Sequence, residues 1–296
     1  MLSGATASGK TELAIELARR FGAEIVGADS RQIYRGMTIG TAAPTAAQRA
    51  AVPHHLIEIV DPRERYSAAR FSREAVERIR AIHGRGRRAI VAGGTGFYIR
   101  ALTGGVSLAA PAEADIRRRL SREAQMHEPA FLHAWLSIRH PARAAVIASE
   151  DRYRVLRALE IVLMNQENGR PDSPPVSLPS AGIPSVKLFI DVDEALLGER
   201  IGLRVDSMLA AGLLEEAERV GPEAVAASAV GYPQALAHLR GWSTRKELRA
   251  TFVRATRRYA KRQRTWFRTE PHVVWLSGQD LLAQIDTLAK EKLGWA

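Results

Sequence analysis

Short apolar runs and amphipathic stretches alternate through the first hundred residues of the chain. Apolar runs at 24–28, 56–60 and 89–92 predict three buried strands. The stretches between them repeat apolar residues at helical spacing, at Ala14, Leu17, Ala18 and Phe21 and then at Phe71, Ala75, Ile79 and Ile82. Strands that alternate with helices in this way predict an α/β protein with a parallel sheet.

The pattern changes in the middle of the chain. Strand signals vanish from about residue 111 to 166, and this Arg-rich stretch reads as helical. A connector with five prolines follows at 168–185, and an apolar run at 186–190 restores a strand. We therefore predict an α/β core, residues 1–110 and 186–296, that is interrupted by a mostly helical insertion, residues 111–185.

Residues 4–11, GATASGKT, match the phosphate-loop pattern G-x-x-x-x-G-K-[ST], and a helical stretch follows at once. We expect this P-loop to hold a di- or triphosphate, with Lys10 neutralising a phosphate and Thr11 placed to touch Mg²⁺. The residues we assign to the phosphates are Thr6, Ala7, Ser8, Gly9, Lys10 and Thr11. Only three residues precede Gly4, so we expect part of the first strand to lie upstream of Met1.

Two further elements end strands on the side of the sheet where α/β proteins bind ligands. Asp29 follows the apolar run at 24–28, and its carboxylate is a candidate general base or Mg²⁺ ligand; the alternative is an ordinary turn or capping residue. The turn Gly93–Gly96 follows the third run, and the Thr95 hydroxyl is placed to reach a ligand unless this is a plain strand–helix turn.

Composition narrows the functional classes. The 296 residues include 43 Lys and Arg against 32 Asp and Glu, a net charge of +11, and no cysteine. Disulfides, thiolate metal sites and cysteine nucleophiles are therefore excluded, and no apolar run is long enough to span a membrane. Seven basic residues and no acidic one fall within 251–268. Such a segment indicates either a polyanionic partner or a solvated basic helix.

Other candidate residues favour structural roles. The eight histidines show no metal-ligand spacing, so His54 and His55 are expected to be loop residues. Asp191 and Asp193 precede a helical stretch and are expected to cap it. Trp266 and Phe267 are expected in the core rather than on a base-stacking surface.

Taken in order, the motifs resemble those of the tRNA dimethylallyltransferase family. The resemblance rests on GATASGKT at 4–11, DSRQIY at 29–34, GGTGFY at 93–98, RALE at 157–160 and KRQRTWFR at 261–268. It implies a P-loop α/β core with an inserted helical domain, the two gripping the anticodon arm of tRNA. It also implies that the loop and Mg²⁺ hold the diphosphate of dimethylallyl diphosphate rather than ATP.

The resemblance assigns roles to individual residues. Asp29 is the implied base for N6 of the adenosine at position 37, next to the anticodon, and Thr95 the implied contact to that adenosine or the tRNA. The implied tRNA contacts are Asp29, Ser30, Arg31, Gln32, Thr95, Arg117, Tyr153, Arg154, Val155, Leu156 and Arg157, to which we add Arg257, Lys261 and Arg264 of the basic segment.

Four positions depart from the family pattern. Thr38 stands where Asp is usual, Ala43 where Lys is usual and Tyr153 where Gln is usual. Pro233 often corresponds to an Arg or Lys that supports the diphosphate. Another cation must take over that role, or diphosphate affinity is lower.

Three other functions remain open at this point: a P-loop small-molecule kinase, a prenyltransferase acting on free adenine nucleotides, and a non-catalytic RNA-binding protein. The first two leave the basic segment unexplained, and the intact Lys10, Thr11, Asp29 and Thr95 argue against the third. We further expect a monomer that works in the cytoplasm and has no membrane partner.

Overall fold

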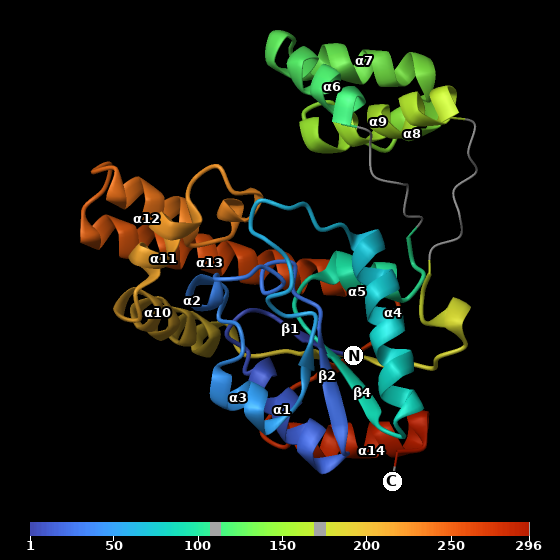
Figure 1. Ribbon diagram of the computed structural model, residues 1–296, viewed down its shortest axis with the longest axis vertical. Helices are drawn as coiled ribbons and strands as arrows, with labels where there is room; N and C mark the ends of the chain where they lie inside the picture. The colour runs from blue at the N-terminus through green and yellow to red at the C-terminus, as the bar shows by residue number, and fades with distance from the viewer. Residues whose placement is uncertain (107–113, 169–175, 296) are drawn as a thin grey trace. The chain divides into compact units, whose positions relative to one another are not determined.

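A sheet of parallel strands forms the centre of the computed structural model (Figure 1). Within the residues that the structure describes (1–106, 114–168 and 176–295), six strands run in the order β3-β2-β4-β1-β5-β6. They are β1 (Leu2–Gly4), β2 (Ala23–Gly27), β3 (His54–His55), β4 (Arg88–Ala92), β5 (Lys187–Ile190) and β6 (Val273–Leu276). The short β1 lies between β4 and β5, with Leu2 in register with Ala92 and Leu188. The predicted α/β fold class is confirmed.

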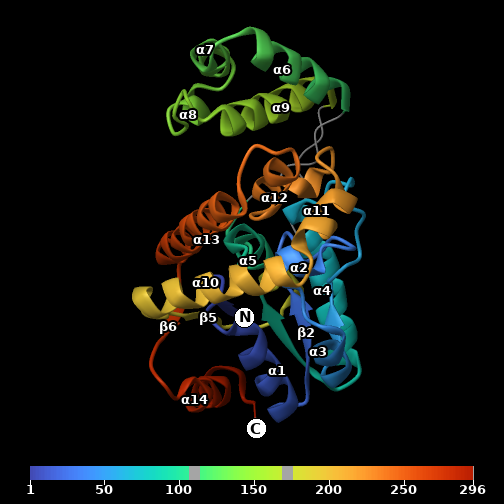
Figure 2. The same cartoon turned by 90° about the vertical axis from the view of Figure 1, so that its left-hand side faces the viewer.

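Helices cover both faces of the sheet (Figure 2). On one face, α1 (Lys10–Arg20) and α14 (Leu281–Leu293) share a core with Ile25, Ile90 and Leu188. On the other lie α4 (Ala68–Gly84) and α5 (Gly96–Leu102), with the end of α13 (Arg245–Arg268) stacked on Phe189 through Phe267. The remaining helices of this unit are α2 (Thr38–Thr41), α3 (Ala46–Ala51), α10 (Glu194–Ala210), α11 (Leu213–Val220), α12 (Tyr232–Leu239) and the short 3₁₀ turns Pro179–Ala181 and Val225–Ser228.

A second compact unit, Ser107–Pro175, is wholly helical in its described part. It contains α6 (Ala114–Met126), α7 (Pro129–Arg139), α8 (Pro141–Ala144) and α9 (Arg152–Asn168). These helices enclose an apolar core of their own that includes Leu120, Leu136 and Leu159. The helical character predicted for this part of the chain is therefore confirmed.

The boundaries between the units differ from those we predicted. The first unit comprises Met1–Val106 and Val176–Ala296, so the insertion spans 107–175 rather than 111–185. Residues after 175 belong to the α/β core because Ser72 Oγ donates a hydrogen bond to the Val176 carbonyl at 2.5 Å and Leu178 N donates to the Leu102 carbonyl at 2.8 Å. Leu178 is only 2% exposed. The proline content predicted an irregular connector, but it did not predict that the second half of the connector packs against the α/β core.

The strand predicted at 56–60 is wrong. The strand in this region, β3, comprises His54 and His55 alone, because Leu56 and Glu58 adopt left-handed φ values of 57° and 53°. Their segment turns away from the sheet and pairs with the loop after β2, where Glu58 N donates to the Gln32 carbonyl at 2.9 Å. The strand was predicted from an apolar run, and the composition of that run does not indicate the backbone turn that takes it away from the sheet.

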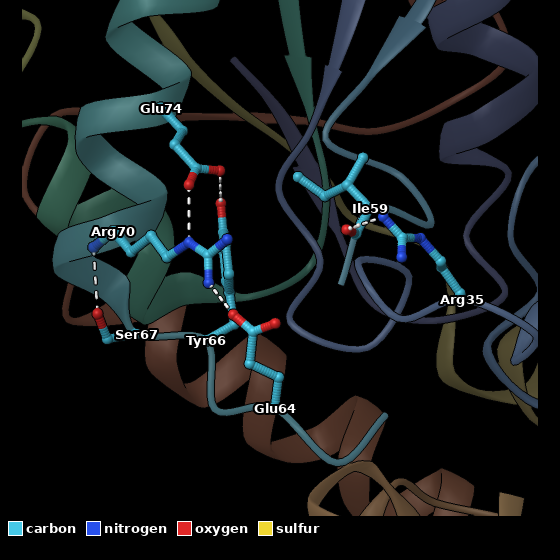
Figure 3. A network of polar contacts seen from close by, with 7 residues as sticks. All are labelled: Arg35, Ile59, Glu64, Tyr66, Ser67, Arg70 and Glu74. Carbon is cyan, nitrogen blue, oxygen red and sulfur yellow. Dashed lines mark hydrogen bonds and ion pairs between the residues drawn. The ribbon is translucent and has the colours of Figure 1, made fainter. Parts of the chain in front are cut away.

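Polar contacts fix the loops that lead to the start of α4 (Figure 3). Arg70 Nε donates to Glu74 at 2.7 Å, and the Tyr66 hydroxyl donates to the same carboxylate at 2.8 Å. In the adjacent loop, the Arg35 guanidinium donates to the Ile59 carbonyl at 2.8 Å. These contacts hold the segments after β2 and β3, one of which carries the candidate base.

The basic segment predicted near the C-terminus forms most of α13, which has 24 residues. Its N-terminus is closed by a capping box in which the Thr244 hydroxyl accepts from Glu247 N and the Glu247 carboxylate accepts from Thr244 N. Its buried face includes Leu248, Phe252 and Phe267. Across the described ranges, no helix combines the length and apolar character needed to cross a membrane.

Candidate active site

The P-loop curls between the end of β1 at Gly4 and the start of α1 at Lys10. Ala7 and Gly9 adopt left-handed φ values of 64° and 86°, which turn the chain back on itself. A Cβ on Gly4 would lie 2.7 Å from Ser8 Oγ, so glycine is required there. Ser8 Oγ is buried and has no hydrogen-bond partner in the described part of the chain. An unpaired hydroxyl inside a phosphate loop indicates a missing polar ligand.

Two cations lie at this loop without an ion-pair partner among the described residues. Lys10 Nζ donates to the Ala5 carbonyl at 2.8 Å, and burial lowers its pKa to about 8. Arg204, from α10, makes a long contact of 3.5 Å to the Thr41 carbonyl, and burial lowers its pKa as well. Half-buried positive charges that form no close ion pair favour the binding of an anion.

The carboxylate of Asp29 faces these cations from the end of β2. Its Oδ1 accepts hydrogen bonds from Arg31 N at 2.8 Å and from Gln32 N at 3.4 Å. Asp29 therefore has the geometry of a turn residue, because backbone amides fix its carboxylate, and it also lines the cavity described below. Its role as a base or Mg²⁺ ligand stays a prediction.

The glycine-rich turn after β4 packs directly on the end of β2. A Cβ on Gly93 would lie 2.2 Å from the Ala28 carbonyl oxygen, so the close approach depends on glycine. Thr95 Oγ1 accepts from Ser30 N at 2.9 Å, and burial raises the pKa of Tyr259. The sheet thus brings the predicted residues Asp29 and Thr95 to one place.

These elements enclose a cavity of about 260 Å³. Its lining combines cations, one carboxylate and apolar side chains, and includes Thr6, Lys10, Thr11, Asp29, Ile57, Arg204, Tyr259 and Gln263. A cavity of this character suits a ligand that has an anionic part and an apolar part and is attacked next to a fixed base.

Comparison with known proteins decides the family. A family model described as IPP transferase matches residues 32–270, and one described as isopentenyl transferase matches residues 1–56. A tRNA dimethylallyltransferase of Anaeromyxobacter dehalogenans is 45% identical over 289 residues, covering 94% of each chain. One of Geobacter sulfurreducens is 41% identical, covering 99% of this chain and 96% of the relative. The chain belongs to the IPP transferase family.

Solved structures agree with this assignment. The tRNA isopentenylpyrophosphate transferase of Bacillus halodurans has a TM-score of 0.70 and 36% identity, covering 99% of this chain and 94% of its own. A eukaryotic dimethylallyltransferase acting on tRNA has a TM-score of 0.77 and 26% identity, covering 98% of this chain and 76% of its own. The resemblance predicted from the motifs is confirmed.

The core residues predicted to contact tRNA divide into exposed and engaged groups. Arg257 and Lys261 are exposed on α13. Arg264, on the same helix, is half-buried and donates to Asp191 Oδ2 at 2.9 Å. The Gln32 side chain donates to the carbonyls of the α2 region, so its role there is to fix the loop. Asp191 was predicted to cap a helix and instead pairs with α13.

The predicted contacts in the helical unit also divide. Arg117 and Arg157 both hydrogen-bond the carboxylate of Glu160, at 2.9 and 2.8 Å. Tyr153 is 80% exposed, whereas Val155 is 1% exposed within the unit's own core. The predicted tRNA contact of Val155 is therefore corrected: its side chain stabilises the unit and does not reach solvent. Leu156 is half-buried against the same core, whereas Arg154 is exposed; the tRNA contacts of these and the remaining residues stay predictions.

Several structural expectations are resolved. Asp193 caps α10 by accepting from Ala195 N at 2.9 Å, as predicted. Phe267 is 1% exposed and lies in the core, while Trp266 is half-buried with the Arg100 guanidinium 4.3 Å from its ring centre. His54 and His55 are not loop residues: both lie in β3, and His55 contacts the buried carboxylate of Glu24 at 2.7 Å.

The departures from the family pattern have structural counterparts. Thr38 begins α2, and the buried Glu216 carboxylate accepts from Ile39 N at 2.9 Å and Gly40 N at 2.8 Å, so this helix start is capped without an acid at position 38. Pro233 lies in the first turn of α12, is exposed and is absent from the cavity lining.

Motif reasoning missed Arg204, Tyr259 and Gln263, which all line the cavity. Arg204 is one of two arginines in an ordinary helix, so no local signal marks it. Tyr259 and Gln263 lie within the basic segment, where the charged residues form the pattern and nothing in the sequence distinguishes these two neutral ones. A helix that crosses the open end of a sheet contributes side chains by topology rather than by motif.

Substituting Lys10 tests the burial of its charge. Because the pKa falls from 10.5 to about 8 in the folded state, the unfolded chain binds this proton more tightly. Folding is therefore penalised below pH 8, and the penalty fades as pH rises from 8 to 10.5. Lys10→Met should raise the free energy of unfolding at pH 7, with an advantage that shrinks by pH 10, as measured by urea unfolding.

Lys261→Met is the matched control, since Lys261 is exposed on α13. Its effect on the free energy of unfolding should be small and the same at both pH values. A Lys10→Met protein that is less stable than the wild type at pH 7, or whose difference does not change with pH, would show that Lys10 bears no burial penalty.

Proposed function

We propose that this protein transfers a dimethylallyl group from dimethylallyl diphosphate to N6 of the adenosine at position 37 of tRNA, next to the anticodon. The observation that carries the proposal is one cavity in which two half-buried cations, Lys10 and Arg204, face the fixed carboxylate of Asp29. The family relatives are named for this transfer.

The cations account for the leaving group. In the reaction the bond between C1 of the dimethylallyl group and the diphosphate oxygen breaks, and the electron pair leaves with the diphosphate. We assign stabilisation of that negative charge to Lys10 and Arg204, together with Ser8 Oγ and the amides of the loop. Arg204 then supplies the second cation that Pro233 is unable to provide.

The carboxylate accounts for the nucleophile. Adenine N6 is a weak nucleophile because its lone pair is delocalised into the ring. As the N6–C1 bond forms, N6 must lose a proton, and we assign that proton to the carboxylate of Asp29. Its hydrogen bonds from Arg31 N and Gln32 N orient the carboxylate before the substrate arrives. A positioned base of this kind accelerates a reaction by roughly 10²–10⁴-fold.

The residues also fit a Mg²⁺ ion. Mg²⁺ is commonly bound by one or two protein oxygens together with substrate phosphates and water. Thr11 Oγ1 and the Asp29 carboxylate line the same cavity, while no group of three or more His, Asp or Glu side chains in the described residues forms a separate protein cage. We propose that Thr11 holds the ion against the diphosphate, whose charge it would neutralise.

The exposed basic face of α13 is our candidate for the tRNA phosphates. Arg254, Arg257, Arg258, Lys261 and Arg262 are all exposed on this helix. Tyr259 and Gln263 of the same helix line the cavity, so one helix spans from the reacting groups to the basic surface. The target base must leave its stack to reach such a cavity.

Asp29→Asn tests base catalysis. The amide keeps an oxygen to accept from Arg31 N but has no basicity toward the N6 proton. We expect the single-turnover rate constant to fall by about 10²–10⁴-fold, with little change in the affinities for tRNA and diphosphate. Rapid-quench assays with labelled dimethylallyl diphosphate and filter binding of tRNA measure the two effects.

Lys10→Ala is the comparison variant, because it should weaken diphosphate affinity as well as turnover. A transfer rate for Asp29→Asn within a few-fold of the wild-type rate would rule out Asp29 as the base. Loss of diphosphate affinity in Asp29→Asn, with no separate loss of rate in the saturated complex, would make Asp29 a binding residue.

Salt dependence tests the α13 surface. Each phosphate contact contributes roughly 0.7–0.9 to the magnitude of the slope of log K against log salt. The double substitution of Arg257 and Lys261 by Gln should therefore reduce the slope for tRNA binding by about 1.5. Arg264→Gln is the control, because its charge is already paired with Asp191. Equal slopes for the double variant and the wild type would remove these two residues from the RNA surface.

A further inference from the structure

One side chain of α13 joins the two loops of the cavity. Gln263 is 5% exposed, and its amide makes two hydrogen bonds to backbone groups far away in the sequence. Gln263 Oε1 accepts from Thr6 N in the P-loop at 2.8 Å, and Gln263 Nε2 donates to the Gly94 carbonyl at 2.9 Å. Both ends of the amide are therefore used, and they bridge the loops that follow β1 and β4.

The backbone of the glycine-rich turn approaches this amide closely. A Cβ on Gly94 would lie 2.1 Å from Gln263 Nε2, so the glycine is needed for the contact. One helical turn further along α13, Phe267 packs on Phe189 with ring centres 4.9 Å apart. Gln263 is thus anchored by a helix that is itself fixed to the sheet.

The contact with Thr6 has a consequence for Lys10. Thr6 N–H and the Ala5 carbonyl are the two ends of one peptide unit, and in a planar trans peptide they point in opposite directions. Gln263 holds the N–H end at 2.8 Å, and Lys10 Nζ donates to the carbonyl end at 2.8 Å. The orientation of this single peptide plane therefore links the buried amide of Gln263 to the ammonium group of Lys10.

We propose that Gln263 is a positioning residue for the reaction, which sets the Ala5–Thr6 peptide plane and through it the place of the Lys10 ammonium group in the diphosphate site. The Thr6 amide, which we had assigned to the phosphates, is engaged by Gln263 and acts through the shape of the loop. The inference rests on the proposed function, because it assumes that the ligand of Lys10 is a diphosphate.

The test is a double-mutant cycle. Gln263→Met keeps the length of the side chain and removes both hydrogen bonds. We expect it to weaken binding of inorganic diphosphate with Mg²⁺, measured by calorimetry, by tenfold or more. It should also lower kcat/KM for dimethylallyl diphosphate by tenfold or more. In a Lys10→Met background the same substitution should change kcat/KM less than twofold, because the group it positions is absent.

Two further variants separate positioning from general stability. Leu248→Val alters the core at the other end of the same helix, away from Gln263, and should lower the melting temperature while leaving diphosphate affinity unchanged. Gln263→Asn keeps the amide but is one methylene too short to span both loops, so it should also weaken diphosphate binding. It replaces Gln263→Met in the test if that variant folds poorly.

The outcomes are distinct. Diphosphate affinity of Gln263→Met and Gln263→Asn equal to that of the wild type would overturn the inference, as would an equal loss of kcat/KM with and without Lys10. Absence of diphosphate binding by the wild-type protein would instead overturn the proposed function.

Discussion

The site depends on one electrostatic constraint: two half-buried cations share a cavity and form no ion pair among the described residues. Lys10 and Arg204 lie in one cavity, burial lowers the pKa of each, and neither forms an ion pair among the described residues. Such an arrangement is unfavourable in the empty protein and becomes favourable when an anion binds. Binding of an anion therefore offsets the free-energy cost of holding these two charges close together.

The sheet provides the geometry that this constraint needs. β1 lies between β4 and β5, and the ends of β1, β2 and β4 lead to the P-loop, Asp29 and the Gly93–Gly96 turn. Parallel strands bring these chain ends to one edge, where ligands of α/β proteins bind. α13 then closes the edge by crossing it with Tyr259 and Gln263, and the same helix carries the exposed basic residues.

Local sequence signals predicted much of this arrangement. The parts that depend on contacts between distant segments could not be predicted from the sequence. The P-loop, Asp29 and Thr95 were predictable because short motifs and strand ends mark them. Arg204 was not, because one arginine on a helix gains its meaning only when topology brings α10 to the loop. The strand predicted at 56–60 failed for a related reason: its backbone pairs with the loop at Gln32, a contact that apolar content does not encode. The second half of the proline-rich connector likewise packs through Leu178 and joins the core.

The central claim is that this cavity aligns an allylic diphosphate with an adenosine of tRNA. The most direct measurement offers labelled dimethylallyl diphosphate to the protein with tRNA, with AMP or with no acceptor, and tests ATP separately as a phosphoryl donor. The account predicts that label enters tRNA at the adenosine next to the anticodon, that AMP and the blank remain unlabelled, and that ATP is unchanged. Label in AMP, or phosphoryl transfer from ATP without transfer to tRNA, would contradict it.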